Sequence, residues 1–148
     1  MELGAAVPGD VPQLVELLGI LFAQEHELSP DPQKQRRALE LILADPSRAR
    51  IYVAREGGKA IAMAALHFTT STAEGGKVAG LEDCVVHPAH RRKGVGKALL
   101  EYIITQARAK GALRVMLLTD GDNTRAQALY RKLGFAPSSM LAMRLKLG

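Results

Sequence analysis

The chain has 148 residues, 47% of them hydrophobic, with a formal net charge of +5 and one cysteine. That length and apolar content suit a single domain over residues 1–148, which builds its own core without metal or disulfide support. We expect a soluble cytoplasmic protein, because no segment approaches the roughly 20 consecutive apolar residues that cross a bilayer and the N-terminus lacks the basic and apolar parts of a signal peptide.

The positive charge is concentrated in one short stretch. Four residues there account for all but +1 of the net charge: Arg91, Arg92, Lys93 and Lys97. Such a patch suits a compact polyanion better than a long phosphate track. Aromatic residues make up only 4% of the chain and tryptophan is absent, so few side chains can stack on bases. A basic nucleic-acid-binding module is therefore the less favoured alternative.

The first third of the chain predicts a short strand and two helices. Residues 4–7 have strand composition, and Asp10 then stands where an N-cap begins a helix. Asp31 and Pro32 form the N-cap and first position of a second helix, which ends before Asp45. The apolar stripe of the first helix follows a 3.6-residue spacing: Val11, Leu14, Val15, Leu18, Leu21 and Phe22.

The middle of the chain predicts an antiparallel meander followed by a long helix. Strands are expected at 50–55, 59–70 and 78–86, because β-branched and apolar residues alternate with glycine-containing turns. Residues 94–110 have one apolar face at helical spacing, and Gly111 follows as a helix stop.

The last third predicts a strand, a helix and a strand. Residues 113–118 are almost wholly apolar, as in a buried strand, and a helix over 123–133 ends at Gly134. Residues 140–147 alternate, with Leu141, Met143, Leu145 and Leu147 on one face, and would close the sheet. The fold class is α+β, or mixed α/β, with a central and partly antiparallel sheet.

The basic stretch has the chemistry of a pyrophosphate cradle. It follows a strand and leads into a helix start, where unpaired N–H groups and the helix dipole attract anions. Gly94 and Gly96 would let phosphate oxygens approach the backbone. A Walker loop would need Gly-Lys-Ser/Thr, and a Rossmann fingerprint would need a third glycine near Leu99; the chain has neither.

This stretch resembles the acetyl-CoA signature of the GNAT superfamily of N-acetyltransferases, Arg/Gln-x-x-Gly-x-Gly/Ala, at Arg91, Gly94 and Gly96. Residues 123–135 resemble the superfamily's Asn-x-x-Ala-x-x-x-Tyr-x-x-x-Gly-Phe helix. The resemblance covers most of the chain. It implies a largely antiparallel sheet of six to seven strands with about four helices, strands four and five being splayed. It also implies transfer of acetyl from acetyl-CoA to an amine.

The resemblance assigns residues to the cofactor. Strands 78–86 and 113–118 would part around the pantetheine arm, whose amides would pair with the backbone of the first strand. The basic loop would wrap the pyrophosphate, and Asn123 would hold the cofactor from the other side. The expected cofactor-binding residues are Cys84, Val85, Val86, Arg91, Arg92, Lys93, Gly94, Val95, Gly96, Lys97 and Asn123.

Two residues are candidates for proton transfer. Tyr130 occupies the superfamily's tyrosine position and would protonate the departing thiolate, although its helical spacing also fits core packing. Glu82 lies in Leu-Glu-Asp, which resembles diamine and polyamine acetyltransferases of this superfamily, where the glutamate helps deprotonate the amine. Strand alternation sends Asp83 to the opposite face, so we expect Asp83 to be structural. We also expect Cys84 to be structural, and no metal site is predicted.

The acceptor and the oligomeric state stay open. A diamine, polyamine or similar small amine is favoured, and an acidic loop with Glu25, Glu27 and Asp31 would suit a cation. A protein lysine or N-terminus is an alternative acceptor, and a non-catalytic acetyl-CoA-binding regulatory domain is an alternative function. The tail after Gly134-Phe135 is short, so we expect either one strand fewer in the sheet or a sheet completed by a partner chain in a homodimer.

Overall fold

The computed structural model describes residues 1–25 and 27–148. The chain divides into two compact units, Met1–Leu117 and Leu118–Gly148, and each is described by itself. The first unit contains, in chain order, β1 (Glu2–Ala5), a 3-10 turn (Pro8–Asp10), α1 (Val11–Gln24), α2 (Pro32–Ala44), β2 (Ala49–Glu56), β3 (Lys59–Ser71), β4 (Gly76–Val86), a second 3-10 turn (Pro88–His90), α3 (Val95–Ala109) and β5 (Val115–Leu117). The second unit contains α4 (Thr124–Lys132).

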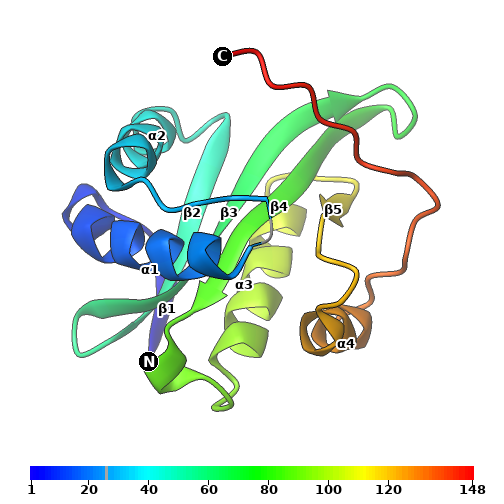
Figure 1. Ribbon diagram of the computed structural model, residues 1–148. Coiled ribbons are helices and arrows are strands. Elements are labelled where there is room, and N and C mark those ends of the chain that lie inside the picture. The colour runs from blue at the N-terminus through cyan, green and yellow to red at the C-terminus, as the bar shows by residue number, and fades with distance from the viewer. Residues whose placement is uncertain (26) are drawn as a thin grey trace. The chain divides into compact units, whose positions relative to one another are not determined.

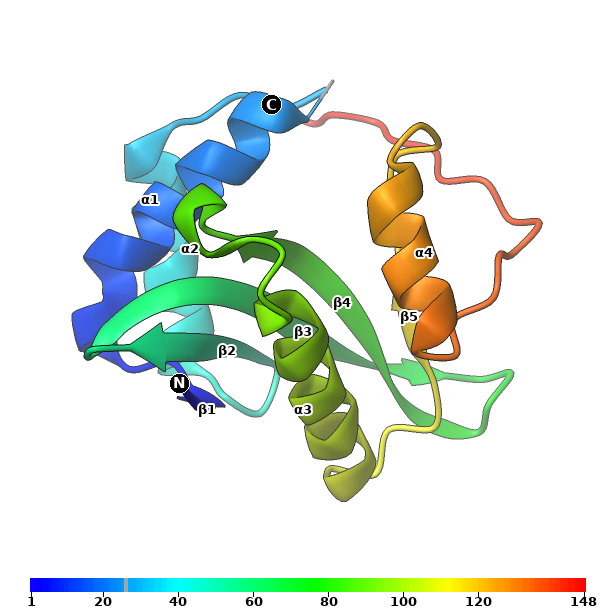
Figure 2. The same ribbon diagram turned by 90° about the horizontal axis from the view of Figure 1, so that it is seen from below.

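The first unit is an open sheet covered on both faces. Its five strands lie in the order β1-β2-β3-β4-β5; the first four are antiparallel neighbours, and β5 runs parallel to β4 (Figure 1). Figure 2 shows α1 and α2 on one face of this sheet and α3 on the other. The mixed α+β class and the antiparallel meander expected from the sequence are thus confirmed.

Side chains that alternate along the strands supply apolar residues to both faces of the sheet. Side chains on the α1 and α2 face form one buried cluster: Val11, Leu14, Leu17, Leu18, Leu39, Ile51, Val53, Ala60, Met63, Ala65 and Val85. The intervening residue Tyr52 points to the other face, where its ring contacts Tyr102 of α3 edge-on at 5.8 Å. Because strand side chains alternate between faces, one strand sequence supplies both layers.

The helix ends follow the predicted chemistry with one exception. Asp31 caps α2 by accepting a hydrogen bond from the Lys34 N–H at 3.3 Å. Gly111, with φ at +81°, ends α3, and the Ala112 N–H donates back to the Ala107 carbonyl at 3.0 Å.

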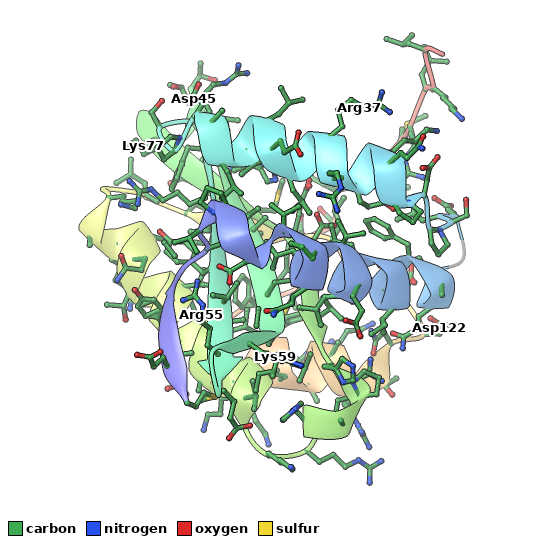
Figure 3. The ribbon with its side chains drawn as sticks, turned by 90° about the vertical axis from the view of Figure 1, so that its left-hand side faces the viewer. Arg37, Asp45, Arg55, Lys59, Lys77 and Asp122 are labelled. Carbon is green, nitrogen blue, oxygen red and sulfur yellow. The ribbon has the colours of Figure 1, made fainter. Side chains whose placement is uncertain are left out.

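Asp10 is the exception, because its side chain does not cap α1. Its carboxylate is buried, accepts a hydrogen bond from the Val7 N–H at 2.8 Å and pairs with the Arg55 guanidinium of β2. Figure 3 shows Arg55 beside β1 and the start of α1. Asp10 forms the ion pair instead of the cap because burying an unpaired carboxylate costs more free energy than losing one side-chain cap.

The predicted closing strand is absent from the described residues. Residues 136–148 have no regular structure, and the apolar side chains of this tail lie 83–96% exposed: Met140, Leu141, Met143, Leu145 and Leu147. The first strand is also shifted, to Glu2–Ala5 from 4–7, and the sheet has five strands instead of six to seven. Alternation describes only the order of side chains, whereas a strand also needs a neighbour that completes its backbone hydrogen bonds.

Candidate functional site

The predicted cofactor strand, β4, extends beyond its pairing with β5. β5 pairs with β4 over only three positions, and the last pair joins Leu117 to Leu81. β4 continues to Val86, and in the described part of the chain no strand pairs with residues 82–86 on that side. The edge of β4 at Val85 and Val86 thus lies beyond its pairing with β5, a geometry that suits a ligand binding like an added strand.

Backbone geometry directs one N–H group along this edge. The His87 N–H donates to the Ile61 carbonyl at 2.8 Å. Val86 and Ala62 are therefore a non-hydrogen-bonded pair of the antiparallel ladder, and the N–H and C=O groups of each residue point away from the partner strand. The Val86 carbonyl accepts a hydrogen bond from Arg91 Nε at 3.0 Å. Since both groups of one strand residue point the same way, the Val86 N–H also faces this edge.

The start of α3 lies a few residues beyond this edge. Gly94 is the N-cap residue, with φ at +77° and no side-chain hydrogen bond capping the helix. A Cβ added at Gly94 would meet no atom within 4 Å, so the space in front of the helix is open. Arg91, Arg92 and Lys93 are exposed around it. Uncapped N–H groups, open space and three cations together fit an anionic ligand such as a pyrophosphate.

Two histidines at this end of β4 have carboxylate partners that the sequence analysis did not identify. His87 Nε2 lies 3.5 Å from Glu16 of α1, and His90 Nδ1 lies 3.2 Å from Glu56 of β2. His87 also accepts the Ala89 N–H through Nδ1 at 3.2 Å. These partners come from distant segments of the chain, so no local sequence signal identifies them.

The carboxylates of β4 lie on a distorted segment. Glu82 is exposed and its Oε2 lies 3.5 Å from His67 Nε2 of β3, a residue that the sequence analysis overlooked. Asp83 is half-buried and has φ at +55°, a left-handed conformation uncommon outside glycine. Burial, with the charges of Glu82 and Glu25 adding to it and that of His67 opposing it, raises the pKa of Asp83 to about 6.

The other cofactor residue and the tyrosine belong to the second unit. Asn123 is the N-cap of α4, and its Oδ1 accepts a hydrogen bond from the Ala126 N–H at 3.3 Å. Tyr130 is half-buried, with its ring 5.9 Å from that of Phe135 in an edge-on contact. The turn at Gly134 produces this contact, since the Phe135 N–H donates to the Tyr130 carbonyl at 3.0 Å.

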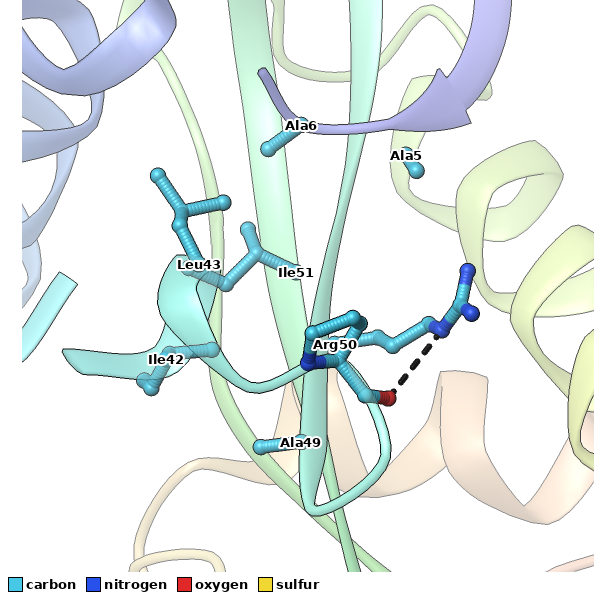
Figure 4. Close-up of a pocket in the computed structure, with 8 residues that line it drawn as sticks. Ala5, Ala6, Ile42, Leu43, Ala49, Arg50 and Ile51 are labelled. Carbon is cyan, nitrogen blue, oxygen red and sulfur yellow. Dashed lines mark hydrogen bonds between the residues drawn. The ribbon is translucent and has the colours of Figure 1, made fainter. Parts of the chain in front are cut away.

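A surface hollow elsewhere in the first unit contains none of the predicted site residues. It has a volume of about 210 Å³ and lies between the end of β1, the end of α2 and the start of β2 (Figure 4). Arg50 lines it and donates through Nε to the Pro46 carbonyl at 3.3 Å. Most of its lining is aliphatic, so it lacks groups for proton transfer: Ala5, Ala6, Ile42, Leu43, Pro46, Ala49, Arg50 and Ile51.

Two negative findings apply to residues 1–25 and 27–148. No helix among them is long and apolar enough to cross a membrane. No group of three or more histidine, cysteine, aspartate or glutamate side chains among them is arranged to hold a metal ion.

Similarities to known proteins extend over most of the chain. The model of the acetyltransferase (GNAT) family matches residues 13–135. Glucosamine 6-phosphate N-acetyltransferase of Trypanosoma brucei brucei is 29% identical over 140 residues, 91% of this chain and 88% of that protein. Mycothiol acetyltransferase of Beutenbergia cavernae is 40% identical over 57 residues, 38% of this chain but only 19% of that protein. A solved acetyltransferase of Trypanosoma brucei has a TM-score of 0.75 at 28% identity, covering 99% of both chains.

Proposed function

The chain belongs to the acetyltransferase (GNAT) family, and from this premise we propose that it transfers an acetyl group from acetyl-CoA to a primary amine of a small molecule. The observation that carries the proposal is the open, glycine-capped start of α3, which follows the exposed Arg91, Arg92 and Lys93 and the end of β4 beyond its pairing with β5. One element suits a pyrophosphate and the other suits the amides of a pantetheine arm.

Four parts of the chain are proposed to hold acetyl-CoA: the basic loop, the start of α3, the end of β4 and Asn123. The cations from Arg91 to Lys93, with Lys97 of α3, neutralise phosphate charge. The N–H groups at the start of α3, at Val95 and Gly96, donate hydrogen bonds to phosphate oxygens. Cys84 to Val86 pair with the pantetheine amides. Asn123 is included because of its place in the second family motif. Its Oδ1 caps α4, and its side-chain NH₂ group is the donor that would serve the cofactor.

Direct transfer within a ternary complex requires three further tasks of the chain. The Val86 N–H, on the edge of β4 beyond its pairing with β5, donates to the carbonyl oxygen on which negative charge develops. The carboxylates at the end of β4, with Glu82 as the candidate from the sequence, take the proton from the acceptor ammonium. Tyr130, assigned by the second motif, protonates the departing sulfur. Bound acetyl-CoA supplies the activated acyl group.

The acceptor we propose is a small cationic amine such as a diamine or polyamine. The resemblance at Leu81-Glu82-Asp83 supports it, as does the excess of carboxylates over cations among the groups that act on Asp83. An amino sugar phosphate is a second candidate, because the relative matched over most of both chains is named for glucosamine 6-phosphate. A peptide acceptor needs an open groove instead of a pocket for a small amine.

A coupled thiol-release assay with acetyl-CoA tests this function. The acceptor panel contains diamines, polyamines, glucosamine 6-phosphate, amino acids and basic peptides, and binding of acetyl-CoA is measured separately by calorimetry. Tyr130→Phe removes only the hydroxyl, so we expect the affinity for acetyl-CoA to persist while kcat falls about 10²-fold, a typical effect of losing one proton-transfer group. Thr69→Val, a change on an exposed strand residue, is the control and leaves both unchanged.

The outcomes separate the candidate functions. Turnover on one class of amine identifies the acceptor, and a basic peptide as the responsive class would establish the protein-acetylating alternative. Acetyl-CoA binding without turnover, unaffected by Tyr130→Phe, would favour the non-catalytic regulatory domain. Absence of acetyl-CoA binding would contradict the proposal as a whole.

A further inference from the structure

The carboxylate end of β4 contains an irregularity that the strand pattern does not predict. β3 and β4 pair Met63 with Val85 and Ala65 with Glu82. Two residues of β4, Asp83 and Cys84, therefore lie opposite Ala64 alone, which is a β-bulge. A bulge redirects the side chain of the extra residue and interrupts the alternation of faces.

The bulge interrupts the alternation that would separate the two carboxylates. Regular alternation would send Glu82 and Asp83 to opposite faces. In the folded chain, Asp83 lies within the electrostatic reach of Glu82 on its own strand, His67 on β3 and Glu25 at the end of α1. Glu82 itself contacts His67. Both carboxylates thus act in one group of charges, contributed by three elements of the first unit.

The two carboxylates differ in their surroundings. The Glu82 side chain is 64% exposed, and His67 lies 3.5 Å away as a partner. Asp83 is half-buried on the bulge, where water solvates its charge less well. A rise in the pKa of Asp83 from 3.8 to about 6 makes it roughly a 10²-fold stronger base than an ordinary aspartate. A base works best when its pKa lies close to the working pH.

We propose that Asp83 is the group that accepts the proton of the acceptor ammonium, while Glu82, held by His67, orients that ammonium. This inference rests on the function proposed above and assigns its base. The Asp83 carboxylate and R–NH₃⁺ become a carboxylic acid and R–NH₂. The nitrogen then forms its bond to the acetyl carbon as the carbon–sulfur bond breaks. The sulfur leaves with the proton of Tyr130, the second nitrogen proton restores the Tyr130 hydroxyl, and Asp83 returns its proton to solvent.

The test is the pH dependence of kcat and kcat/KM on the responsive amine. Asp83→Asn is the informative variant, because asparagine also tolerates the left-handed backbone of the bulge. We expect the wild type to lose activity below about pH 6. Asp83→Asn should lower kcat about 10²-fold and abolish that acid limb, with acetyl-CoA affinity unchanged. Glu40→Gln, on an exposed position of α2, is the control and keeps the wild-type profile.

The neighbouring residues give signed shifts that a merely structural role would not produce. Glu82→Gln removes a negative neighbour, so it should move the acid limb to lower pH and raise KM more than it lowers kcat. His67→Gln removes a positive neighbour, so it should move the limb to higher pH. Both directions follow from the charges that act on Asp83.

Several results would overturn the assignment. Near-wild-type kcat in Asp83→Asn, with the loss of activity at acid pH still present, would overturn it. If Glu82→Gln instead lowers kcat and abolishes that acid limb, the base is Glu82. If Asp83→Asn does not fold, carbon NMR of the Asp83 carboxyl in the wild type replaces it, and a pKa near 4 would refute the proposal. A wild type that transfers acetyl to no amine contradicts the proposed function itself, whereas these results contradict only the role of Asp83.

Discussion

Two aspartates of the first unit show how surroundings determine what a carboxylate does. Asp10 is buried, yet it has the Arg55 guanidinium and the Val7 N–H as partners. Asp83 is less buried, but burial without such partners raises its pKa, and two of the three charges that act on it are carboxylates. A paired carboxylate supports the fold, whereas one that folding places among like charges is destabilising when ionised and is suited to accept a proton.

The raised pKa of Asp83 predicts a pH-dependent cost in stability. Below pH 3.8 the residue is protonated in both the folded and unfolded states and costs nothing. As the pH rises to about 6, the unfolded state ionises more readily, so the wild type loses stability. The full cost above pH 7 is about 3 kcal/mol. Asp83→Asn should therefore gain stability over the wild type between pH 4 and 6, with a constant difference above pH 7.

Urea unfolding of wild type and Asp83→Asn across this pH range measures the difference. Glu82→Gln is the comparison, because Glu82 is largely exposed and its replacement should change the pH dependence much less. A difference between Asp83→Asn and wild type that stays flat from pH 4 to 7 would contradict the raised pKa.

Two helices of this protein end at a glycine whose backbone conformation stops the helix. Gly111 and Gly134 both have positive φ and both follow a helix, α3 and α4, whose last carbonyls accept the returning N–H groups. Short, local hydrogen bonds of this kind leave a sequence signature, because only glycine adopts the conformation at low cost. The bulge at Asp83 leaves no such signature, since its register depends on β3.

Glycine substitutions at two positions should have opposite effects on stability. Gly111 has φ at +81° and open space around it, so Gly111→Ala costs only backbone strain, about 1 kcal/mol. Gly19 lies inside α1, also with open space and without positive φ, so Gly19→Ala should stabilise by about 0.5–1 kcal/mol. Thermal unfolding of both variants checks the prediction, and effects of equal sign would contradict this account of the α3 end.

At the scale of the whole molecule, the family match over residues 13–135 includes parts of both compact units. We propose that residues 1–148 act as one domain and that the protein works in the cytoplasm as a homodimer. The exposed tail supports the dimer. Its apolar residues alternate as in a strand, and an exposed row of this kind is a ready surface for a second copy.

Sedimentation at the concentration of the assay should therefore show a dimer. Replacing Leu141 and Met143 together by serine removes two of the exposed apolar groups and should shift the protein to a monomer. Leu41→Ser is the control, because Leu41 is also exposed, at 70%, but lies on α2. A monomeric wild type would refute the dimer, and a dimer that persists in the double variant would show that the tail does not form it.

Local patterns in the sequence determined most of the elements and the glycine-capped start of α3. Side-chain alternation, helical spacing and glycine turns depend on neighbours within a few residues, so they predicted the meander, α3 and α4. Tertiary structure decided the rest. The Arg55 partner of Asp10, the His67 partner of Glu82 and the bulge at Asp83 all depend on distant segments meeting, and residues 140–147 lack the neighbouring strand that their alternation requires.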